Sequence, residues 1–248
     1  MNHIPLTDRD KAILGDCYRH TVISFGQIHK RHFMGNAKAT VHNRLTELLH
    51  RGLVTKSRVG ALAHPGGKNN VGVVYQISRQ GIRALNETHP DGGLRQDPLR
   101  LSLYSLPHDL LLNEVVWALE RRYPQTSFRH GRLITDPDAK RVPDAEFTLG
   151  SDRIAVELEL TAKSEKRYRE IVWQYLLSPI FTKIVYVASD RIRDKISEQI
   201  AGRKTLPGLP RPTTGKFYFV ELSALLNYPT QTLITNGEET LKVEVKSW

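Results

Sequence analysis

Three of the five carboxylates in RVPDAEFTLGSDRIAVELELTAK, which covers residues 141–163, are expected to lie close to one amine. Asp144 stands in the first half of this stretch, and Glu157, Glu159 and Lys163 stand in its second half. Carboxylate oxygens are the ligands that Mg²⁺ and Mn²⁺ prefer, and a bound ion of this kind can activate a water for attack on a phosphodiester. A nearby lysine could orient that water or stabilise the charge that develops on phosphorus. The stretch therefore predicts metal-dependent phosphodiester chemistry.

Two short strands are expected to carry these acids. Alternating apolar and polar residues predict strands near 142–149 and 153–160, joined by a two-residue turn at Gly150. This register sets apolar residues opposite one another and Asp144 opposite Glu157, with Cβ atoms about 5 Å apart. Like charges so close destabilise a sheet unless a divalent cation lies between them or one acid is protonated. The alternative is a solvated strand face whose acids pair with the basic residues from Lys163 onward.

Further helices and strands surround this hairpin. Amphipathic spacing predicts a helix in DLLLNEVVWALERRY and two more near residues 165–177 and 190–201. Strands are predicted near 126–134, in KIVYVAS and in KFYFVEL, with a final pair around 231–247. Helices mixed with strands in this way predict an α/β domain with a mixed sheet over residues 108–248.

The chain resembles the PD-(D/E)XK nuclease superfamily in the pattern Pro143-Asp144, Glu157-Leu158-Glu159 and Lys163. The resemblance implies a restriction-endonuclease-like mixed sheet with flanking helices. It also implies a site for Mg²⁺ or Mn²⁺ with Asp144 and Glu157 as ligands, and Glu159 beside them. The lysine of the superfamily normally stands two residues after the second acid, where this chain has Glu159. Lys163 would then be a displaced catalytic lysine, with Lys166 in reserve.

Superfamily members often add an acid or a polar group from a helix that precedes the sheet. The resemblance implies Glu114 for this role, although His108 and Asn113 are also available on the same helix. The alternative is that Glu114 is an ordinary exposed acid of an amphipathic helix.

The first third of the chain has the element order of a winged helix-turn-helix. Thr7 and Asp10 form a near capping box before a first helix, and Ser24 caps a second. A third helix, AKATVHNRLTELLHRG, leads into a strand, LVTKSRV, a polar tip, AHPGGKNN, and a returning strand, VGVVYQI. A short helix, SRQGIRAL, follows. This order predicts a DNA-binding domain over residues 1–87 and a linker over residues 88–107.

In a winged helix the third helix enters the major groove of DNA and the hairpin tip reaches an adjacent groove or a phosphate. Side chains that donate to base edges and phosphates are expected on the solvent face of that helix and on the wing. The predicted contacts on the helix are Lys38, Thr40, His42, Asn43 and Arg44, and those on the wing are Lys56, Arg58 and Lys68. The alternative is a winged helix that binds protein.

Charge is unevenly distributed along the 248 residues. Residues 1–85 hold 13 Lys and Arg against 4 Asp and Glu, whereas the remainder holds 23 against 22. This asymmetry favours a polyanionic partner, double-stranded DNA, for the first domain. A single cysteine excludes an internal disulfide, and with no secretory signal or long apolar run the expected location is the cytoplasm.

A wider resemblance covers most of the chain. The winged helix, the HDLLLNEVVWAL helix, PDAEF and VELELTAKSEKRY look like the replication–relaxation family, and within it the MobC-type plasmid relaxases. Those proteins nick a transfer origin with metal ions, which implies a role in conjugative mobilisation with accessory relaxosome and coupling proteins as partners. The sequence therefore predicts a Mg²⁺- or Mn²⁺-dependent nicking endonuclease.

Two alternatives remain beside this prediction, and two others are disfavoured. One is a non-catalytic DNA-binding regulator or replication initiator with a nuclease-like fold, and another is a restriction-type enzyme that cuts both strands. A tyrosine relaxase would hold its metal with clustered histidines, but the ten histidines here are scattered. An ATP-driven helicase is disfavoured because no GxxxxGK[ST] loop is present.

Overall fold

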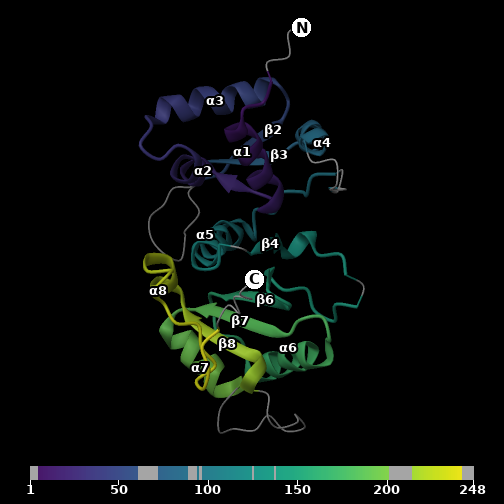
Figure 1. Cartoon of the computed structure of the whole chain (residues 1–248), viewed down its shortest axis with the longest axis vertical. Helices are drawn as coiled ribbons and strands as arrows, with labels where there is room; N and C mark the ends of the chain where they lie inside the picture. The colour runs from purple at the N-terminus through teal and green to yellow at the C-terminus, as the bar shows by residue number, and fades with distance from the viewer. Residues whose placement is uncertain are drawn as a thin grey trace, which may run out of the picture. The chain divides into compact units, whose positions relative to one another are not determined.

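The computed structural model describes residues 5–60, 72–88, 94, 97–124, 126–136, 138–200 and 214–241. The chain divides into two compact units, Met1–Leu110 and Leu111–Trp248. Each unit has its own sheet: three strands in the first and five in the second (Figure 1). No helix of the described residues is long and apolar enough to cross a membrane.

The first unit combines helices with a small antiparallel sheet. Its elements are α1 (Asp8–Arg19), β1 (Ile23–Ser24), α2 (Phe25–His32), α3 (Lys38–His50), β2 (Val54–Arg58), β3 (Val73–Ile77) and α4 (Arg79–Thr88). The strand order is β1-β3-β2, with both pairings antiparallel. The predicted helices and the two longer strands are confirmed, and β1 is an addition. The tip of the hairpin, with Lys68, lies outside the described residues.

Capping boxes begin the first two helices. Thr7 caps α1 together with Asp10, and Ser24 caps α2 together with Gln27. The predicted apolar stripe of α3 is buried at Val41, and the same helix buries two leucines further along the chain. The α3 residues Lys38, His42 and Asn43, which lie outside this buried stripe, are exposed to solvent.

The buried Asp16 joins α1 to α2 through ion pairs with partly exposed cations. Its carboxylate accepts hydrogen bonds from Arg31 Nε at 2.7 Å and from the ring of His32 at 2.9 Å, and Arg19 pairs with its other oxygen. Burial alone would raise the pKa of Asp16, but the hydrogen bond to His32 and the neighbouring cations lower the pKa well below its usual range. Asp16 therefore stabilises the first unit in its charged form.

The stability of the first unit should fall at acidic pH as Asp16 becomes protonated. An acid with a lowered folded-state pKa contributes stability that is complete above its unfolded pKa, about 3.9 for Asp, and is lost as the pH falls through the folded value. We expect Asp16→Asn to flatten the fall in the urea midpoint between about pH 5 and pH 3. Urea unfolding of both proteins at pH 6, 4 and 3 measures this, and parallel pH profiles would contradict it.

The second unit is built on a mixed five-stranded sheet. Its elements are α5 (Leu106–Arg122, which begins in the first unit), β4 (Ser127–His130), η1 (Gly131–Leu133), β5 (Ala145–Leu149), β6 (Asp152–Glu159), α6 (Glu165–Leu177), β7 (Lys183–Ala188), α7 (Asp190–Ile200), η2 (Thr214–Lys216), β8 (Phe217–Glu221) and α8 (Leu222–Asn227). The strand order is β4-β5-β6-β7-β8. The first three strands are antiparallel neighbours, and β6, β7 and β8 run parallel. The predicted mixed sheet is confirmed.

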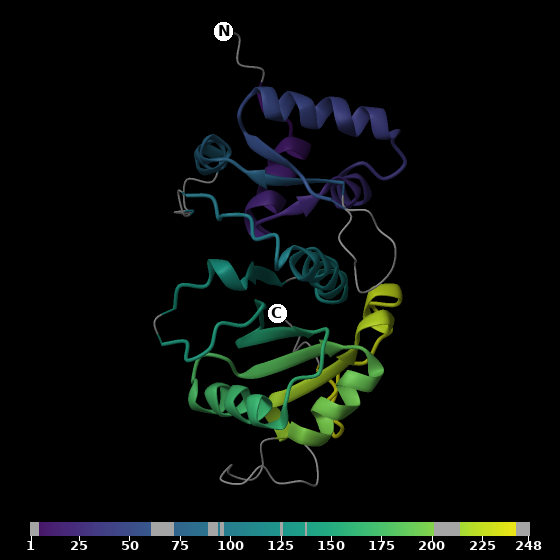
Figure 2. The same ribbon diagram turned by 180° about the vertical axis from the view of Figure 1, so that it is seen from behind.

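Helices cover both faces of this sheet. Apolar residues of α5 and α8 pack on the face that contains Val156 and Leu158, whereas α6 and α7 pack on the face that contains Ala155. Figure 2 shows α6 and α7 together on one side of the strands. Because side chains alternate along β6, Glu157 and Glu159 lie on the side of α6. In the described residues, the predicted final strand pair is represented by two isolated bridges, at Phe219–Thr235 and Thr235–Thr240.

The hairpin has the predicted register. Leu149 faces Asp152, Phe147 faces Ile154 and Ala145 faces Val156. Gly150 adopts a positive φ of 62°, which suits a tight turn because glycine has no Cβ to clash there. The local hydrophobic pattern was therefore sufficient to fix this pairing.

Gly131 sets the distance between η1 and the residues that precede β5. Its N–H donates to the Asp144 carbonyl at 2.7 Å, and an added Cβ would lie 2.0 Å from the Pro143 carbonyl oxygen. We expect Gly131→Ala to lower the free energy of unfolding by about 3 kcal/mol, the upper part of the range for overpacking, because the obstacle is backbone. Chemical denaturation measures the change, with Gly215→Ala as the comparison because an added Cβ there would meet no atom within 4 Å. Equal stabilities of Gly131→Ala and the wild type would contradict the close packing at Asp144.

Candidate functional site

The hairpin brings the predicted acids together at the ends of β5 and β6. Ala145 pairs with Val156, so Asp144 and Glu157 are the next residues along the two strands. Asp144 Oδ2 accepts the Leu158 N–H at 2.8 Å, which fixes its carboxylate against β6. Burial raises the pKa of Glu157, and the charge of Asp144 raises it further. Asp144 and Glu157 therefore lie within electrostatic reach of one another, as predicted.

Arg141 holds both oxygens of Glu157. Its Nε donates to Oε1 at 2.7 Å and its Nη2 donates to Oε2 at 3.0 Å, which is a bidentate pair. The Tyr175 hydroxyl, from α6, also donates to Oε1. The side chains of Arg141 and Glu157 are only 17% and 6% exposed. Although burial opposes it, the contact with Glu157 raises the pKa of Arg141, so the guanidinium remains charged.

Lys163 pairs with Glu159, the second glutamate of β6. The two side chains form an ion pair across four residues, and the Lys163 N–H donates to the Tyr168 hydroxyl at 3.1 Å. Burial raises the pKa of Glu159, the Lys163 ammonium lowers it, and Asp144 raises it. The structure thus places Lys163 beside the acidic cluster, and its amine is engaged by a carboxylate.

These contacts decide whether the acidic cluster fits a divalent cation. Both Glu157 oxygens are taken by Arg141 and Tyr175, Glu159 is paired with Lys163, and one Asp144 oxygen accepts a backbone N–H. Across the part of the chain that the structure describes, no group of three or more His, Cys, Asp or Glu side chains is placed to hold a metal ion. In this arrangement the acidic cluster of Asp144, Glu157 and Glu159 does not fit Mg²⁺ or Mn²⁺.

Glu114 lies on α5 and is half-buried. The apolar side of α5 packs on the sheet face opposite to that of Tyr175 and α6. The helix that carries Glu114 therefore covers the other side of the sheet from the Arg141–Glu157 pair. Its assignment to the site stays a prediction.

The first unit presents the predicted DNA-contact residues on α3 and β2. Lys38, Thr40, His42 and Asn43 are exposed at the start of α3, and Lys56 and Arg58 are exposed on β2. The shared features of this set are solvent exposure and hydrogen-bond donors that can reach nucleic acid. The prediction for Lys68 concerns a residue outside the described part.

Arg44 is engaged within the protein. Its Nε donates to Asp10 Oδ1 at 2.6 Å, its other nitrogens pair with Asp10 and Glu47, and the Asp10 side chain is fully buried. Burial alone would raise the pKa of Asp10, but hydrogen bonds from Arg44 and Thr7 lower it. This geometry makes Arg44 a link between α3 and the start of α1, and its charge is already balanced.

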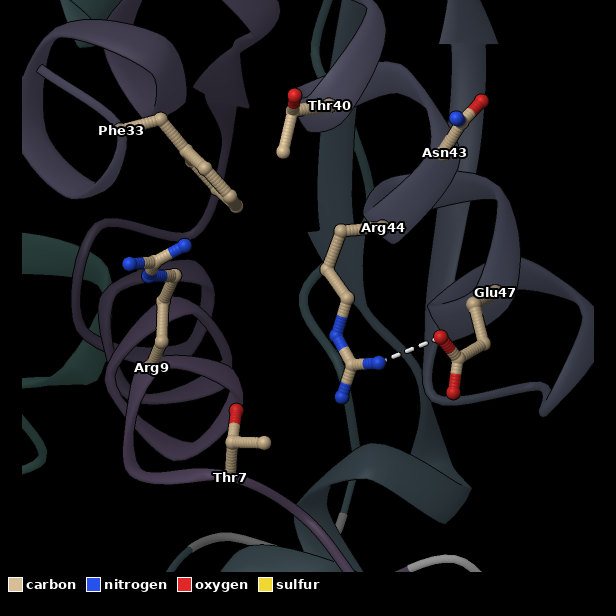
Figure 3. Close-up of a pocket in the computed structure, with 7 residues that line it drawn as sticks. All are labelled: Thr7, Arg9, Phe33, Thr40, Asn43, Arg44 and Glu47. Atoms are coloured by element: carbon tan, nitrogen blue, oxygen red, sulfur yellow. Dashed lines mark hydrogen bonds and ion pairs between the residues drawn. The ribbon is translucent and has the colours of Figure 1, made fainter. Parts of the chain in front are cut away.

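A hollow of about 560 Å³ lies beside α3. Figure 3 shows Arg9 and Phe33 on one side and the α3 residues Thr40, Asn43, Arg44 and Glu47 on the other, with Thr7 between them. The Arg9 guanidinium lies 4.7 Å from the centroid of the Phe33 ring, a cation–π distance. The exposed Arg9 is absent from the predicted DNA contacts. The sequence held a signal for Arg9. A cation in the first turn of a helix interacts unfavourably with the helix dipole, so its presence there indicates a role other than helix stabilisation.

One comparison with known proteins found a match. The model of the Replication-relaxation family matches residues 14–184. The matched range begins in α1, includes α3 and the whole acidic cluster, and ends in β7. No curated protein and no solved structure is matched by the chain.

Proposed function

The chain belongs to the Replication-relaxation family, and from this premise we propose that it binds duplex DNA in plasmid replication or relaxation. The family match covers more than half of the chain and implies interaction with DNA. The single observation that carries the proposal is that the polar start of α3 and the basic residues Lys56 and Arg58 of β2 are all exposed.

The first unit is proposed to act as a winged helix. Three helices and a three-stranded antiparallel sheet in the order found here would place α3 in the major groove and the β2–β3 hairpin on an adjacent groove. Lys38, Thr40, His42 and Asn43 would then face base edges and phosphates. Arg9 is added as a phosphate contact, because Phe33 orients its guanidinium beside α3.

Lys38→Ala is expected to weaken DNA binding because one phosphate is no longer neutralised by the protein. The slope of log K against log salt should fall in magnitude by about 0.9 for that one phosphate, with little dependence on DNA sequence. Fluorescence anisotropy with a labelled duplex at several salt concentrations measures the slope. Arg121→Ala, which removes an exposed cation from α5 of the second unit, is the matched control. A salt slope for Lys38→Ala equal to that of the wild type would move the interface away from the start of α3.

The second unit is proposed to have a restriction-endonuclease-like role in nicking a plasmid or mobile-element origin. The proposal is supported by Asp144, Glu157 and Glu159 on neighbouring strands of a mixed sheet, with Lys163 beside them. Mg²⁺ or Mn²⁺ is the proposed cofactor, and relaxosome and coupling proteins are the proposed partners. Since Arg141 holds Glu157 in the present arrangement, this role requires a rearrangement around Arg141.

A non-catalytic regulator or replication initiator is the second candidate. The specific observation in its favour is the buried Arg141–Glu157–Tyr175 network, which occupies the carboxylate that a nuclease would need. Such a protein would bind DNA with the same affinity in the presence and absence of a divalent ion.

Supercoiled plasmid separates the candidates. The protein is incubated with plasmid that carries or lacks a candidate transfer origin, in Mg²⁺, Mn²⁺ or EDTA, beside the Glu157→Gln variant. Open-circular product that needs both metal and Glu157 supports a nickase, and origin dependence supports a relaxase. Linear product supports a restriction-type enzyme, and intact plasmid with retained DNA binding supports the regulator.

A further inference from the structure

Arg141 stands where the acidic cluster needs a positive charge. It lies three residues before Asp144, so the residues that lead into β5 deliver both an acid and a cation to the same end of the sheet. The guanidinium grips Glu157 with two nitrogens, at 2.7 and 3.0 Å, and lies 5.7 Å from the centroid of the Tyr175 ring. Arg141 therefore packs on the Tyr175 ring and also forms an ion pair with Glu157.

The formal charges of the cluster are nearly balanced by the protein itself. Asp144, Glu157 and Glu159 carry three negative charges when ionised, and Arg141 and Lys163 supply two positive charges through direct ion pairs. One divalent cation would supply the same amount. The acids thus have an internal source of the charge that a metal would bring.

Burial makes this internal charge hard to replace. The Glu157 side chain is 6% exposed, and the Tyr175 hydroxyl donates to the oxygen that Arg141 Nε also contacts. A metal ligand must present a free lone pair, and a carboxylate has about four lone-pair sites. The two guanidinium N–H groups and the phenol use three of these sites on Glu157, two on Oε1 and one on Oε2. Displacement of Arg141 would also leave a desolvated guanidinium without its carboxylate, which is strongly unfavourable.

We propose that Arg141 is the resident counter-ion of the acidic cluster, and that the cluster takes no divalent metal while Arg141 is paired with Glu157. Arg141 is then a residue that sets metal access, and the two candidate functions differ in whether Arg141 ever leaves. The proposal concerns the second unit and holds or fails independently of DNA binding by α3.

Mn²⁺ binding to the full chain tests the proposal without any activity assay. The free Mn²⁺ signal in electron paramagnetic resonance reports the fraction of Mn²⁺ that is bound. Thermal unfolding with and without Mn²⁺ reports whether the ion stabilises the folded protein. The wild type is expected to show no saturable binding that depends on Glu157. Arg141→Gln is expected to bind Mn²⁺ at least about tenfold more tightly than the wild type. In the wild type the Arg141–Glu157 pair must break before metal can bind, and this cost lowers the apparent affinity. Mn²⁺ should also raise the melting temperature of that variant.

Three further variants make the test specific. Arg141→Gln with Glu157→Gln should lose the gained Mn²⁺ binding, and Arg141→Lys should keep Mn²⁺ excluded because the positive charge is retained. Arg153→Gln is the matched control, because Arg153 Nε donates to the buried Glu146 at 2.9 Å. After this substitution Glu146 still accepts a hydrogen bond from Arg129 Nε, at 2.6 Å. Arg153→Gln should gain no Mn²⁺ site.

Two results would overturn the proposal. The first is wild-type Mn²⁺ binding as tight as that of Arg141→Gln and abolished by Glu157→Gln, which would show that Arg141 does not compete with metal. The second is a folded Arg141→Gln variant with no gain in Mn²⁺ binding, which would show that something other than Arg141 keeps metal out. If Arg141→Gln does not fold, saturable Mn²⁺ binding by the wild type that Glu157→Gln abolishes overturns the proposal by itself, and its absence supports the proposal.

Discussion

Arg44→Ala is expected to lower the free energy of unfolding of the first unit by about 3 kcal/mol, the lower end of the range for breaking a buried ion pair. The substitution leaves the fully buried Asp10 carboxylate without the guanidinium that holds both of its oxygens. The lower end applies because Thr7 still donates to Asp10, with its N–H at 2.8 Å and its hydroxyl at 2.7 Å. Urea unfolding followed by circular dichroism measures the change.

Lys38→Ala is the control for Arg44→Ala. Lys38 is exposed on the same helix, so its removal should alter stability by no more than about 0.5 kcal/mol while it weakens DNA binding. The two α3 cations would then separate into one that contacts DNA and one that holds α3 on α1. An Arg44→Ala protein with wild-type stability and reduced DNA affinity would instead restore Arg44 as a direct contact.

Glu157→Ala is expected to destabilise the second unit by about 3–5 kcal/mol, because it strands a desolvated guanidinium. Arg141 would lose its bidentate partner while its side chain stays only 17% exposed, and the Tyr175 hydroxyl would lose its acceptor. The double variant Arg141→Met, Glu157→Leu should recover most of this stability, since apolar residues of similar volume often replace a buried pair at little cost. Chemical denaturation of the wild type, Arg141→Met, Glu157→Leu and the double variant forms the thermodynamic cycle, and Glu157→Ala is measured beside it.

Glu165→Ala is the surface control for this cycle. Glu165 and Arg169 form an exposed pair on α6, at 3.5 Å, whose removal should cost less than about 1 kcal/mol. If Glu157→Ala lowered the free energy of unfolding as little as Glu165→Ala, the Arg141–Glu157 pair would not stabilise the fold. Glu157 would then be available to bind a metal ion. The expected instability also means that cleavage assays need Glu157→Gln, which keeps an acceptor for Arg141.

Local pattern alone determined a large part of this fold. Helix α6 begins after Ser164 and ends at Leu177 as its apolar spacing predicts, and the capping box at Thr7 is present. The β5–β6 register followed from alternation and from one turn at Gly150. These features depend on residues near one another in the chain, where periodicity and backbone preference act directly. Strand β1, with two residues, and α8, with six, are too short to produce such a pattern.

The gathering of Asp144, Glu157, Glu159 and Lys163 was also determined by the sequence, because a hairpin with a known register leaves little freedom. The partner of each charge was not. Glu157 meets Tyr175 only because α6 returns across the sheet, and Arg44 meets Asp10, 34 residues away, only because α1 and α3 pack together. A buried carboxylate takes whichever donor the packing brings within about 3 Å, and periodicity carries no information on that choice. Sequence therefore determined where the charges gather, and tertiary packing decided which of them are already neutralised.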